Sequence, residues 1–310
     1  MRLFLCGDVM LARGIDQILP HPGDPTLHEP YVRDARQYVG LAEEASGSIP
    51  KPVDFSYVWG ELPAVLKERR PDARIGNLET SITRSDDYAR DKGIHYRMSP
   101  RNTEVLEAVP FDCLTLANNH VLDWGVGGLR ETLDILDGRG IGRCGAGTDP
   151  SGAAAPWERL LPRGQTLSVF GVADRSSGIP KDWATRDDRP GVFLKPGNRS
   201  LEAHLEATAG GVIVASIHWG ENWGYAIPSR QQNIARNLID RAGVTVVHGH
   251  SSHHPKGIEL YHGGIIIYGA GDFINDYEGI GGHERYRPEL TAGYIVDTRP
   301  DSRRVAGVEL

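Results

Sequence analysis

Short apolar runs that end in glycine, acidic, amide or histidine residues recur along the chain. A run of this length predicts a buried strand, and the polar cluster after it predicts that the strand carries side chains to one edge of a sheet. The junctions are Arg2–Cys6 before Gly7-Asp8, Ala73–Ile75 before Gly76–Glu79, Cys113–Leu116 before Ala117–His120, Val212–Ile217 before His218–Gly220, Val244–Val247 before His248–His250, and Ile265–Tyr268 before Gly269–Asp272.

Apolar residues at helical spacing lie between these predicted strands. Leu129, Leu133 and Leu136 fall at i, i+4 and i+7 and are followed by a glycine, which is a helix stop signal. A similar apolar face between residues 234 and 242 ends before Gly243. Strands that alternate with helices predict an α/β fold.

The composition is that of a globular protein, with 39% hydrophobic and 24% charged residues in a chain of 310. This length suffices for one large domain, and we expect residues 1–310 to form a single domain. Many of the prolines lie between about residues 20 and 52. We expect this segment to be a long irregular insert with one short helix.

Charge and hydropathy exclude two classes of partner. The formal net charge is -7 and no run of lysine or arginine is present, so we expect no nucleic-acid partner. The longest apolar stretches, such as Val212–Ile217, are far shorter than the roughly 20 residues that cross a bilayer, so we expect no membrane span. A small-molecule partner fits better, and the sequence leaves the oligomeric state open.

The three cysteines are Cys6, Cys113 and Cys144. They are widely spaced and odd in number, and they form no CxxC motif, which favours a reducing compartment over a disulfide framework. We therefore expect a cytoplasmic protein.

Oxygen and imidazole side chains at the predicted strand ends suggest a metal site. Such ligands together suit divalent Mn, Fe or Zn. Two ions a few Å apart can activate a water as nucleophile and clamp the oxygens of a displaced group. Singly these residues have ordinary explanations, since aspartate is a common turn former and a histidine is often only packed in the core. The candidate ligands are Asp8, Glu79, Asn119, His218, His250 and His253.

The segment His248–His254 is the hardest to explain without a metal. It holds four imidazoles within seven residues at a predicted strand end. Protonated imidazoles would repel one another there, and neutral ones gain little unless a cation collects some of them. This clustering favours a metal site over coincidence.

The order of the motifs is more specific than any one of them. It resembles that of the CapA-like family of bacterial capsule and poly-gamma-glutamate synthesis proteins, which is related to the calcineurin-like metallophosphoesterases. The resemblance spans Arg2 to about Phe273 and implies a four-layer α/β/β/α sandwich with a dinuclear metal site at the sheet edges. The motifs are Gly7–Met10, Asn77–Glu79, Ala117–His120 continuing to Asp123 and Gly125, His218–Gly220, Gly249-His250 with His253, and Tyr268–Phe273.

The resemblance also implies roles for single residues. Asp8 matches the first aspartate ligand and Asn119 the amide ligand, while Glu79, with Asn77 as the alternative, matches the bridging position. His120 falls on the family's catalytic histidine, which can donate a proton to a leaving group. His218, His250 and His253 match the remaining ligands.

The chain departs from the wider superfamily at three places, one of which is Glu79, which replaces the usual bridging aspartate. Met10 stands where phosphoesterases usually carry a histidine, and two residues, Ser251 and Ser252, separate His250 from His253 instead of one. These differences leave the reaction and the metal count open.

Two further residues are candidates for the reaction. Arg97 resembles part of a Phe-Arg-x-x-Pro element and is expected to bind a substrate carboxylate or phosphate, with a surface salt bridge as the alternative. Asp123 is expected to orient His120, with a helix N-cap as the alternative.

Together these features predict a metal-dependent hydrolase that acts on a phosphoester or a gamma-glutamyl-type amide. The alternatives are a non-hydrolytic component of poly-gamma-glutamate or capsule biosynthesis, and an amide-forming enzyme on the same fold. For the last, no Walker-type glycine loop is found in the sequence.

Overall fold

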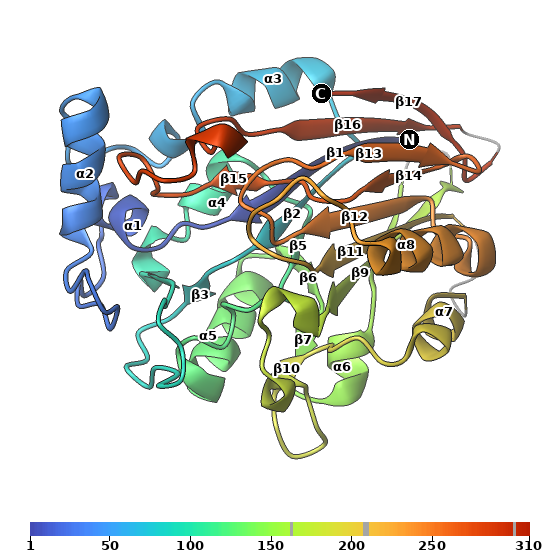
Figure 1. Ribbon diagram of the computed structural model, residues 1–310, viewed down its shortest axis with the longest axis horizontal. Helices are drawn as coiled ribbons and strands as arrows, with labels where there is room; N and C mark the ends of the chain where they lie inside the picture. The colour runs from blue at the N-terminus through green and yellow to red at the C-terminus, as the bar shows by residue number, and fades with distance from the viewer. Residues whose placement is uncertain (162–163, 207–210, 300–301) are drawn as a thin grey trace.

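Two β-sheets lie face to face at the centre of the protein, and helices cover the outer face of each (Figure 1). The computed structural model describes residues 1–161, 164–206, 211–299 and 302–310. This arrangement is the predicted four-layer α/β/β/α sandwich, which is thereby confirmed.

The first sheet has the strand order β17-β16-β1-β2-β5-β6, and β15 also pairs with β1. The pairs β15-β1, β1-β2, β2-β5 and β5-β6 are parallel. The pairs β1-β16 and β16-β17 are antiparallel. Its strands are β1 (Arg2–Val9), β2 (Ala73–Leu78), β5 (Cys113–Thr115), β6 (Gly142–Cys144), β15 (Asp272–Ile274), β16 (Gly293–Thr298) and β17 (Val305–Glu309).

The second sheet has the strand order β13-β14-β12-β11-β9-β8. Its four central strands are parallel, and the two edge strands are antiparallel to their neighbours. Its strands are β8 (Trp157–Leu160), β9 (Thr166–Ala173), β11 (Val212–His218), β12 (Val246–His250), β13 (Ile258–Tyr261) and β14 (Gly264–Ile267).

The remaining elements are helices and two small sheets. Two-residue strands pair as β3 (Ser81–Ile82) with β4 (Arg97–Met98), and as β7 (Ala146–Gly147) with β10 (Gly191–Val192). None of the helices in the described ranges is both long enough and apolar enough to span a membrane. The helices are α1 (Gly14–Ile18), α2 (Arg36–Ser46), α3 (Leu62–Arg69), α4 (Val105–Ala108), α5 (Gly125–Gly138), α6 (Pro150–Ala154), α7 (Asn198–Glu206) and α8 (Ser229–Ala242), with short 3-10 turns at Tyr57–Trp59, Pro100–Asn102, Arg175–Ser177, Lys181–Trp183 and Glu284–Tyr286.

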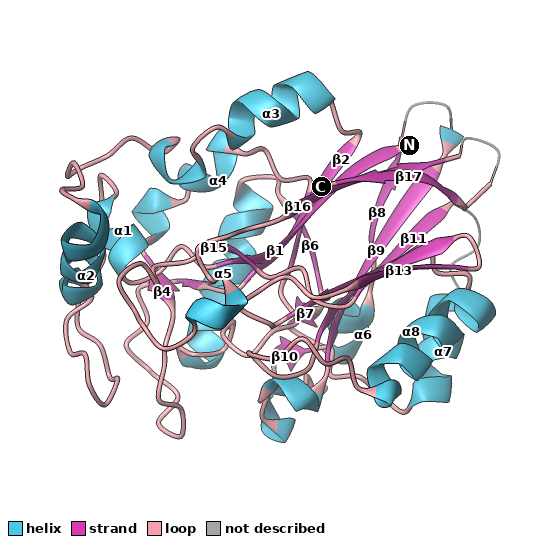
Figure 2. Cartoon of the chain, turned by 45° about the horizontal axis from the view of Figure 1, so that its top comes forward, coloured by secondary structure: helices cyan, strands magenta, loops and turns pink. Residues whose placement is uncertain are grey.

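Alternating side chains of the strands build separate apolar layers. On β1, Leu5 packs between the two sheets with Val214 of the second sheet. Phe4, the preceding residue, faces the outer layer that contains the leucines of α5. On the far side, Leu238 of α8 packs on the outer face of the second sheet, where Figure 2 shows α7 beside α8. Burial on both faces explains the continuous apolar runs in the sequence.

The proline-rich segment is largely irregular. Within residues 20–52, all of which the structure describes, α2 is the one helix, and the rest is irregular apart from a bridge between Thr26 and Asp34. Buried ion pairing attaches this insert to the sheets, because Glu29 lies 3.0 Å from the guanidinium of Arg13 and accepts a hydrogen bond from Tyr38.

Candidate metal centre

Strand register places the candidate ligands at one edge of both sheets. In the first sheet, Asp8 on β1 lies in register with Asn77 on β2 and with Asp272 on β15. In the second sheet, His218 on β11 lies in register with His250 on β12. The predicted strand at 244–247 in fact extends as β12 through His250, so this histidine is part of the strand. Carboxyl ends of parallel strands meet at the same edge, which is where α/β proteins place their sites.

Two glycines allow β1 and β15 to approach each other closely. A Cβ atom at Gly7 would lie 1.8 Å from the carbonyl oxygen of Gly271. That carbonyl accepts a hydrogen bond of 3.0 Å from the backbone N–H of Asp8. Gly271 itself has a φ of +83°, which favours glycine. The glycine before each aspartate therefore brings the two carboxylates side by side.

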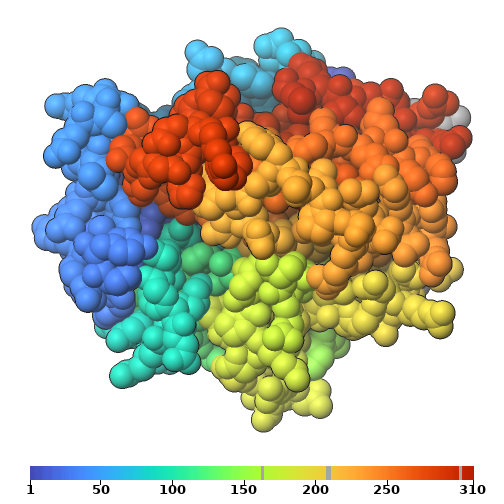
Figure 3. Space-filling view, viewed as in Figure 1, coloured from blue at the N-terminus to red at the C-terminus, as the bar shows by residue number. Residues whose placement is uncertain are grey.

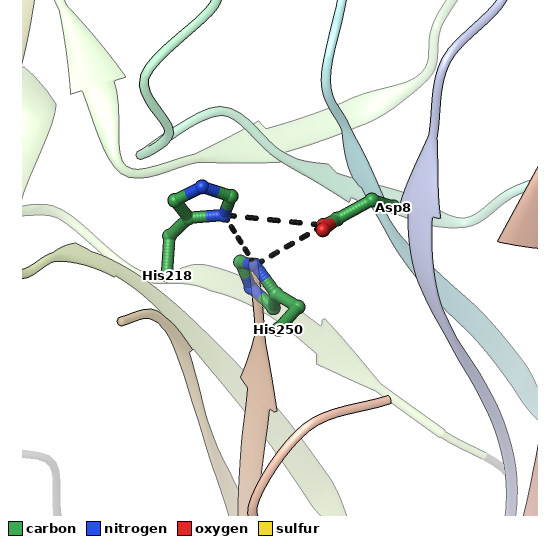
Figure 4. A group of neighbouring side chains, drawn as sticks. All are labelled: Asp8, His218 and His250. Carbon is green, nitrogen blue, oxygen red and sulfur yellow. Dashed lines mark hydrogen bonds and ion pairs between the residues drawn. The ribbon is translucent and has the colours of Figure 1, made fainter. Parts of the chain in front are cut away.

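The first group of possible ligands consists of Asp8, His218 and His250, whose side chains point toward one another (Figure 4). The Nδ1 atoms of the two imidazoles are 2.9 Å apart. Asp8 Oδ1 lies 3.4 Å from His250 Nδ1 and 3.9 Å from His218 Nδ1. All three residues are buried, and their ligand atoms lie within 4.8 Å of one another, a spacing that fits a shared cation.

Hydrogen bonds at the far side of each ring orient the two imidazoles. His218 Nε2 lies 2.7 Å from Asn119 Oδ1, and His250 Nε2 lies 2.9 Å from the hydroxyl of Ser216. Because an amide oxygen only accepts, His218 carries its proton on Nε2 and its Nδ1 lone pair faces Asp8 and His250. That lone pair can accept a proton from His250 or bind a cation. Metal-binding imidazoles are typically held in this way through their second nitrogen.

The second group consists of Asp8, Glu79 and Asp272, whose ligand oxygens also lie within 4.8 Å of one another. Burial, followed by the Asp272 carboxylate, raises the pKa of Asp8 to about 8. Burial, followed by the carboxylates of Asp8 and Asp272, raises the pKa of Glu79 well above its usual range. Three buried carboxylates without a cation are unfavourable as anions, and a divalent ion would remove that penalty.

Glu79 and Asn77, the two residues expected at the bridging position, have different surroundings, and neither belongs to both groups of ligand atoms. Asn77 donates from Nδ2 to Asp8 Oδ1 over 2.7 Å, and its Oδ1 accepts from Thr115 and Asn118. Its amide therefore supports Asp8, whereas Glu79 supplies an oxygen to the second group. Asp8 is further fixed by the backbone N–H of Ser251, 2.9 Å from Oδ2.

Asp272 is the residue of this group that the sequence did not single out as a ligand. The Gly271-Asp272 pair follows an apolar run in the same way as Gly7-Asp8, so the signal was present in the sequence. The sequence could not show that β15 pairs with β1. This pairing brings Asp8 and Asp272, which are 264 positions apart, into register.

His120 lies at the rim of these groups and is held by Asp123. Its Nδ1 is 2.6 Å from Asp123 Oδ2, its ring stacks on Tyr96 at a centroid distance of 4.0 Å, and its Nε2 is 3.9 Å from Glu79 Oε1. Burial lowers the pKa of His120 to about 4, against the opposing effect of Asp123. Asp123 also accepts from the ammonium of Lys92 and is not the N-cap of α5, a position that Trp124 occupies.

The four imidazoles of the 248–254 segment have different surroundings. His253 Nδ1 lies 2.8 Å from Asp272 Oδ2. His248 is buried deeper in the sandwich, with Nδ1 3.1 Å from the hydroxyl of Ser216. His254 accepts from the backbone N–H of Gly224 and stacks on Tyr286. Of the four, His250 and His253 contact carboxylates, but only His250 belongs to one of the two groups, so the role of His253 as a ligand stays a prediction.

A cavity of about 400 Å³ lies beside the centre, and Glu79 of the second group is part of its lining. Such a volume suits a small molecule or the end of a longer one. Figure 3 shows the face on which the insert, in blue, lies next to the orange-red segment near residues 275–290. The lining combines polar groups from the centre with aromatic side chains, among them Glu79, Lys92, Asn119, His120, His253, Tyr38, Tyr96, Trp223 and Tyr277.

Arg97 lies outside this cavity. Its guanidinium stacks over Trp124 at 3.9 Å and forms hydrogen bonds with Ser85 and Asp86. The described residues that line the cavity do not include it. Its role in substrate binding stays a prediction.

Comparison with known proteins places this centre in a family context. The family described as bacterial capsule synthesis protein PGA_cap matches residues 2–277. A probable polyglutamine synthesis accessory protein of Mycobacterium tuberculosis is 46% identical over 316 residues, which cover 99% of this chain and 83% of that protein. The PGA biosynthesis protein CapA of Bacillus subtilis is 31% identical over 210 residues, which cover 67% of this chain and 54% of that protein.

Two solved structures have the same fold. A phosphatase from Mycoplasma pneumoniae superposes with a TM-score of 0.56 at 12% identity, over 100% of this chain and 92% of that one. A hypothetical protein from Thermus thermophilus gives a TM-score of 0.51 at 16% identity, over 99% and 97%. At these identities the similarity establishes the fold alone.

Proposed function

Because the chain belongs to the bacterial capsule synthesis protein family PGA_cap, we propose that it is a metal-dependent hydrolase that cleaves a phosphoester or a gamma-glutamyl-type amide. The observation that carries this proposal is that Asp8 is common to both groups of buried ligand atoms. A carboxylate shared in this way is the usual bridge of a two-metal site. We propose divalent Mn, Fe or Zn as the ions.

The donor atoms fit such ions. Imidazole nitrogens and carboxylate oxygens are the ligands that borderline divalent metals prefer. Burial and neighbouring imidazoles lower the pKa of both His218 and His250 well below the usual range, so both rings are neutral and free to coordinate. When bound, the ions would supply an activated water and would polarise the scissile group.

The protein's own groups orient the reaction. Asn77 and the backbone N–H of Ser251 fix the two oxygens of Asp8. His120 exposes Nε2 to the cavity, because its Nδ1 is engaged by Asp123. Because the lowered pKa leaves the ring neutral with its proton on Nδ1, Nε2 is the atom that would take up a proton and pass it to the departing oxygen or nitrogen of the substrate.

The cationic side chains of the cavity are already paired. Lys92 contacts Asp123, and Arg13 is held between Glu29 and Asp276. The charge of a phosphate or a glutamyl carboxylate would therefore have to be met mainly by the ions themselves. This arrangement makes substrate binding, as well as chemistry, dependent on metal.

A second candidate follows from the names of the relatives. One is called a synthesis accessory protein and another a biosynthesis protein. On this reading the chain would bind a gamma-glutamyl polymer or its precursor as a component of a synthesis complex and hydrolyse nothing. Both candidates retain the metal centre and differ in turnover.

The direct test is an assay of metal-free protein to which Mn, Fe or Zn is returned. p-Nitrophenyl phosphate and a gamma-glutamyl anilide report the two substrate classes. We expect metal-dependent turnover of one of them that His250→Gln removes, while His262→Gln, a change at an exposed imidazole paired with Asp240, leaves it intact. Absence of turnover with every metal, together with metal-dependent binding of a gamma-glutamyl peptide, would support the second candidate.

A further inference from the structure

We propose that Asp272 is a metal ligand and that the two cation subsites differ in chemistry. The nitrogen-rich subsite would be formed by Asp8, His218 and His250, and the all-oxygen subsite by Asp8, Glu79 and Asp272. This inference rests on the metal centre of the proposed function, but it does not depend on which bond is cleaved.

The first support is an unpaired oxygen. Asp272 is 7% exposed, and its Oδ1 is buried without a hydrogen-bond partner among the described residues. Its Oδ2 already contacts His253 Nδ1 at 2.8 Å and accepts from Asn275 at 3.0 Å. Buried carboxylate oxygens are nearly always satisfied, so an oxygen left free beside two other carboxylates points to a missing cation.

The second support is the backbone that presents Asp272. β15 runs parallel to β1, and the pairing of Asp8 with Asp272 shifts register at the next residue. The close approach of Gly7 to Gly271 makes this pairing possible. Such an irregularity aims a side chain at a site. The side chain of Asp272 is thus fixed by the backbone and by two hydrogen bonds, with one oxygen left for the ion.

The chemistry of the two ligand sets predicts different metals. Carboxylate oxygens alone suit harder ions such as Mn or Mg, whereas imidazoles favour Zn. Asp8 belongs to both sets, so the two ions would share its charge. We therefore expect sequential loading, with Zn in the nitrogen-rich subsite and Mn in the all-oxygen subsite.

A structural ion pair between His253 and Asp272 is the competing explanation. Burial lowers the pKa of His253, but the adjacent Asp272 carboxylate outweighs it, so the net pKa is raised. A charged imidazole would neutralise Asp272 without any metal. This explanation accounts for Oδ2 and leaves Oδ1 without a partner.

The test titrates metal-free protein first with Zn and then with Mn, and follows bound metal by calorimetry and Mn by electron paramagnetic resonance. Wild type is expected to take up one equivalent of each. Asp272→Asn keeps the shape and should weaken Mn at least about tenfold, as loss of a ligand does, with Zn affinity little changed. His250→Gln should give the reverse pattern.

The matched control is Asp174→Asn. Asp174 is also a buried aspartate that follows a parallel strand, β9, but its oxygens are paired with Ser176 and Arg230. We expect it to bind both metals as wild type does. If Asp272→Asn fails to fold, as judged by circular dichroism, Glu79→Gln probes the same subsite and should lose Mn selectively.

Unchanged Mn affinity in Asp272→Asn, or equal loss of Zn and Mn, would overturn the inference. These outcomes are separable from failure of the proposed hydrolysis. Selective Mn loss in a protein without turnover supports unlike subsites and removes the enzyme proposal. Full turnover with Asp272→Asn and unaltered Mn binding removes the inference and leaves the enzyme proposal in place.

Discussion

Asp123 holds the imidazole of His120 through a contact of 2.6 Å between Oδ2 and Nδ1. Asp123 is fully buried and is itself fixed by the backbone N–H of Tyr96, 2.8 Å away. The loop that carries His120 and Asp123 is therefore held against the segment that carries Tyr96, beside the metal centre. The ring can rotate little, and Nε2 remains directed toward Glu79.

The first prediction separates proton transfer from metal binding. His120→Ala should retain metal and lose about 10²- to 10⁴-fold in kcat, the usual contribution of a general acid. His253→Ala should lose metal, because its imidazole contacts Asp272. Metal content by elemental analysis and kcat on the same preparations measure both effects. Equal metal loss in the two variants would contradict the assigned roles.

The second prediction concerns Lys92 as a positioning residue. Its ammonium contacts the carbonyl oxygen of Asn119 and Asp123, and lies 3.3 Å from His120 Nδ1. Lys92→Met should lower kcat about tenfold and leave KM nearly unchanged, as loss of an outer hydrogen-bonding partner does. The reason is that the carbonyl of Asn119 and the carboxylate of Asp123 lose the ammonium that both of them contact.

Chemical rescue can show that the ammonium itself is needed. Treatment of Lys92→Cys with bromoethylamine rebuilds a lysine-like side chain. The three native cysteines are 0 to 2% exposed and should be protected in the folded protein. Recovery of kcat after treatment is the expected result, and an effect on KM alone would refute the positioning role.

The third prediction is a pH effect on the metal-free protein. Since the pKa of Asp8 is raised from 3.8 to about 8, the folded state keeps a proton there that the unfolded chain has lost. His120 acts in the opposite sense below pH 6.5, because its pKa is lowered to about 4 in the folded state. There the unfolded chain binds the proton more readily, so the contribution of His120 to the free energy of unfolding is lost as the pH falls. From pH 6.5 to 8 the free energy of unfolding should therefore fall with rising pH.

The slope for one proton is about 1.4 kcal/mol per pH unit. Urea unfolding at several pH values measures it. Saturation with metal or the substitution Asp8→Asn should flatten the dependence, because neither form keeps that proton. A stability that rises with pH across this window would contradict the raised pKa of Asp8.

The fourth prediction concerns the close contact between β1 and β15. Gly7→Ala would place a Cβ against the Gly271 carbonyl, so it should destabilise the fold by about 1–3 kcal/mol and weaken metal binding. Gly40→Ala is the matched control, since nothing lies within 4 Å of its Cβ position in α2. We expect that control to be neutral or stabilising by about 0.5–1 kcal/mol.

The sequence pattern predicted an α/β fold for a physical reason, whereas the four-layer sandwich was implied by the family resemblance. Strands buried on both faces produce continuous apolar runs, and polar residues such as Asp8 and His218 mark where each strand ends. Which strands become neighbours is not encoded locally. The pairing of β15 with β1, and hence the place of Asp272, could be seen only in three dimensions.

Two other features depended on geometry beyond the motif. His248 and His250 lie on the same face of β12, and only their distance along the strand decides that His250 reaches Asp8. Arg97 begins the short strand β4, and its guanidinium stacks over Trp124 and is not part of the cavity lining. Side-chain direction at such a position is set by tertiary contacts, which the sequence pattern does not report.

The most direct test of the account compares metal stoichiometry in Asp8→Asn and His250→Gln, each stripped of metal and titrated with Zn and Mn. Because Asp8 belongs to both groups of ligands, its substitution should abolish or severely weaken binding at both subsites, whereas His250→Gln should weaken only one. Two equivalents bound by Asp8→Asn with the affinity of wild type would contradict a centre built around this carboxylate.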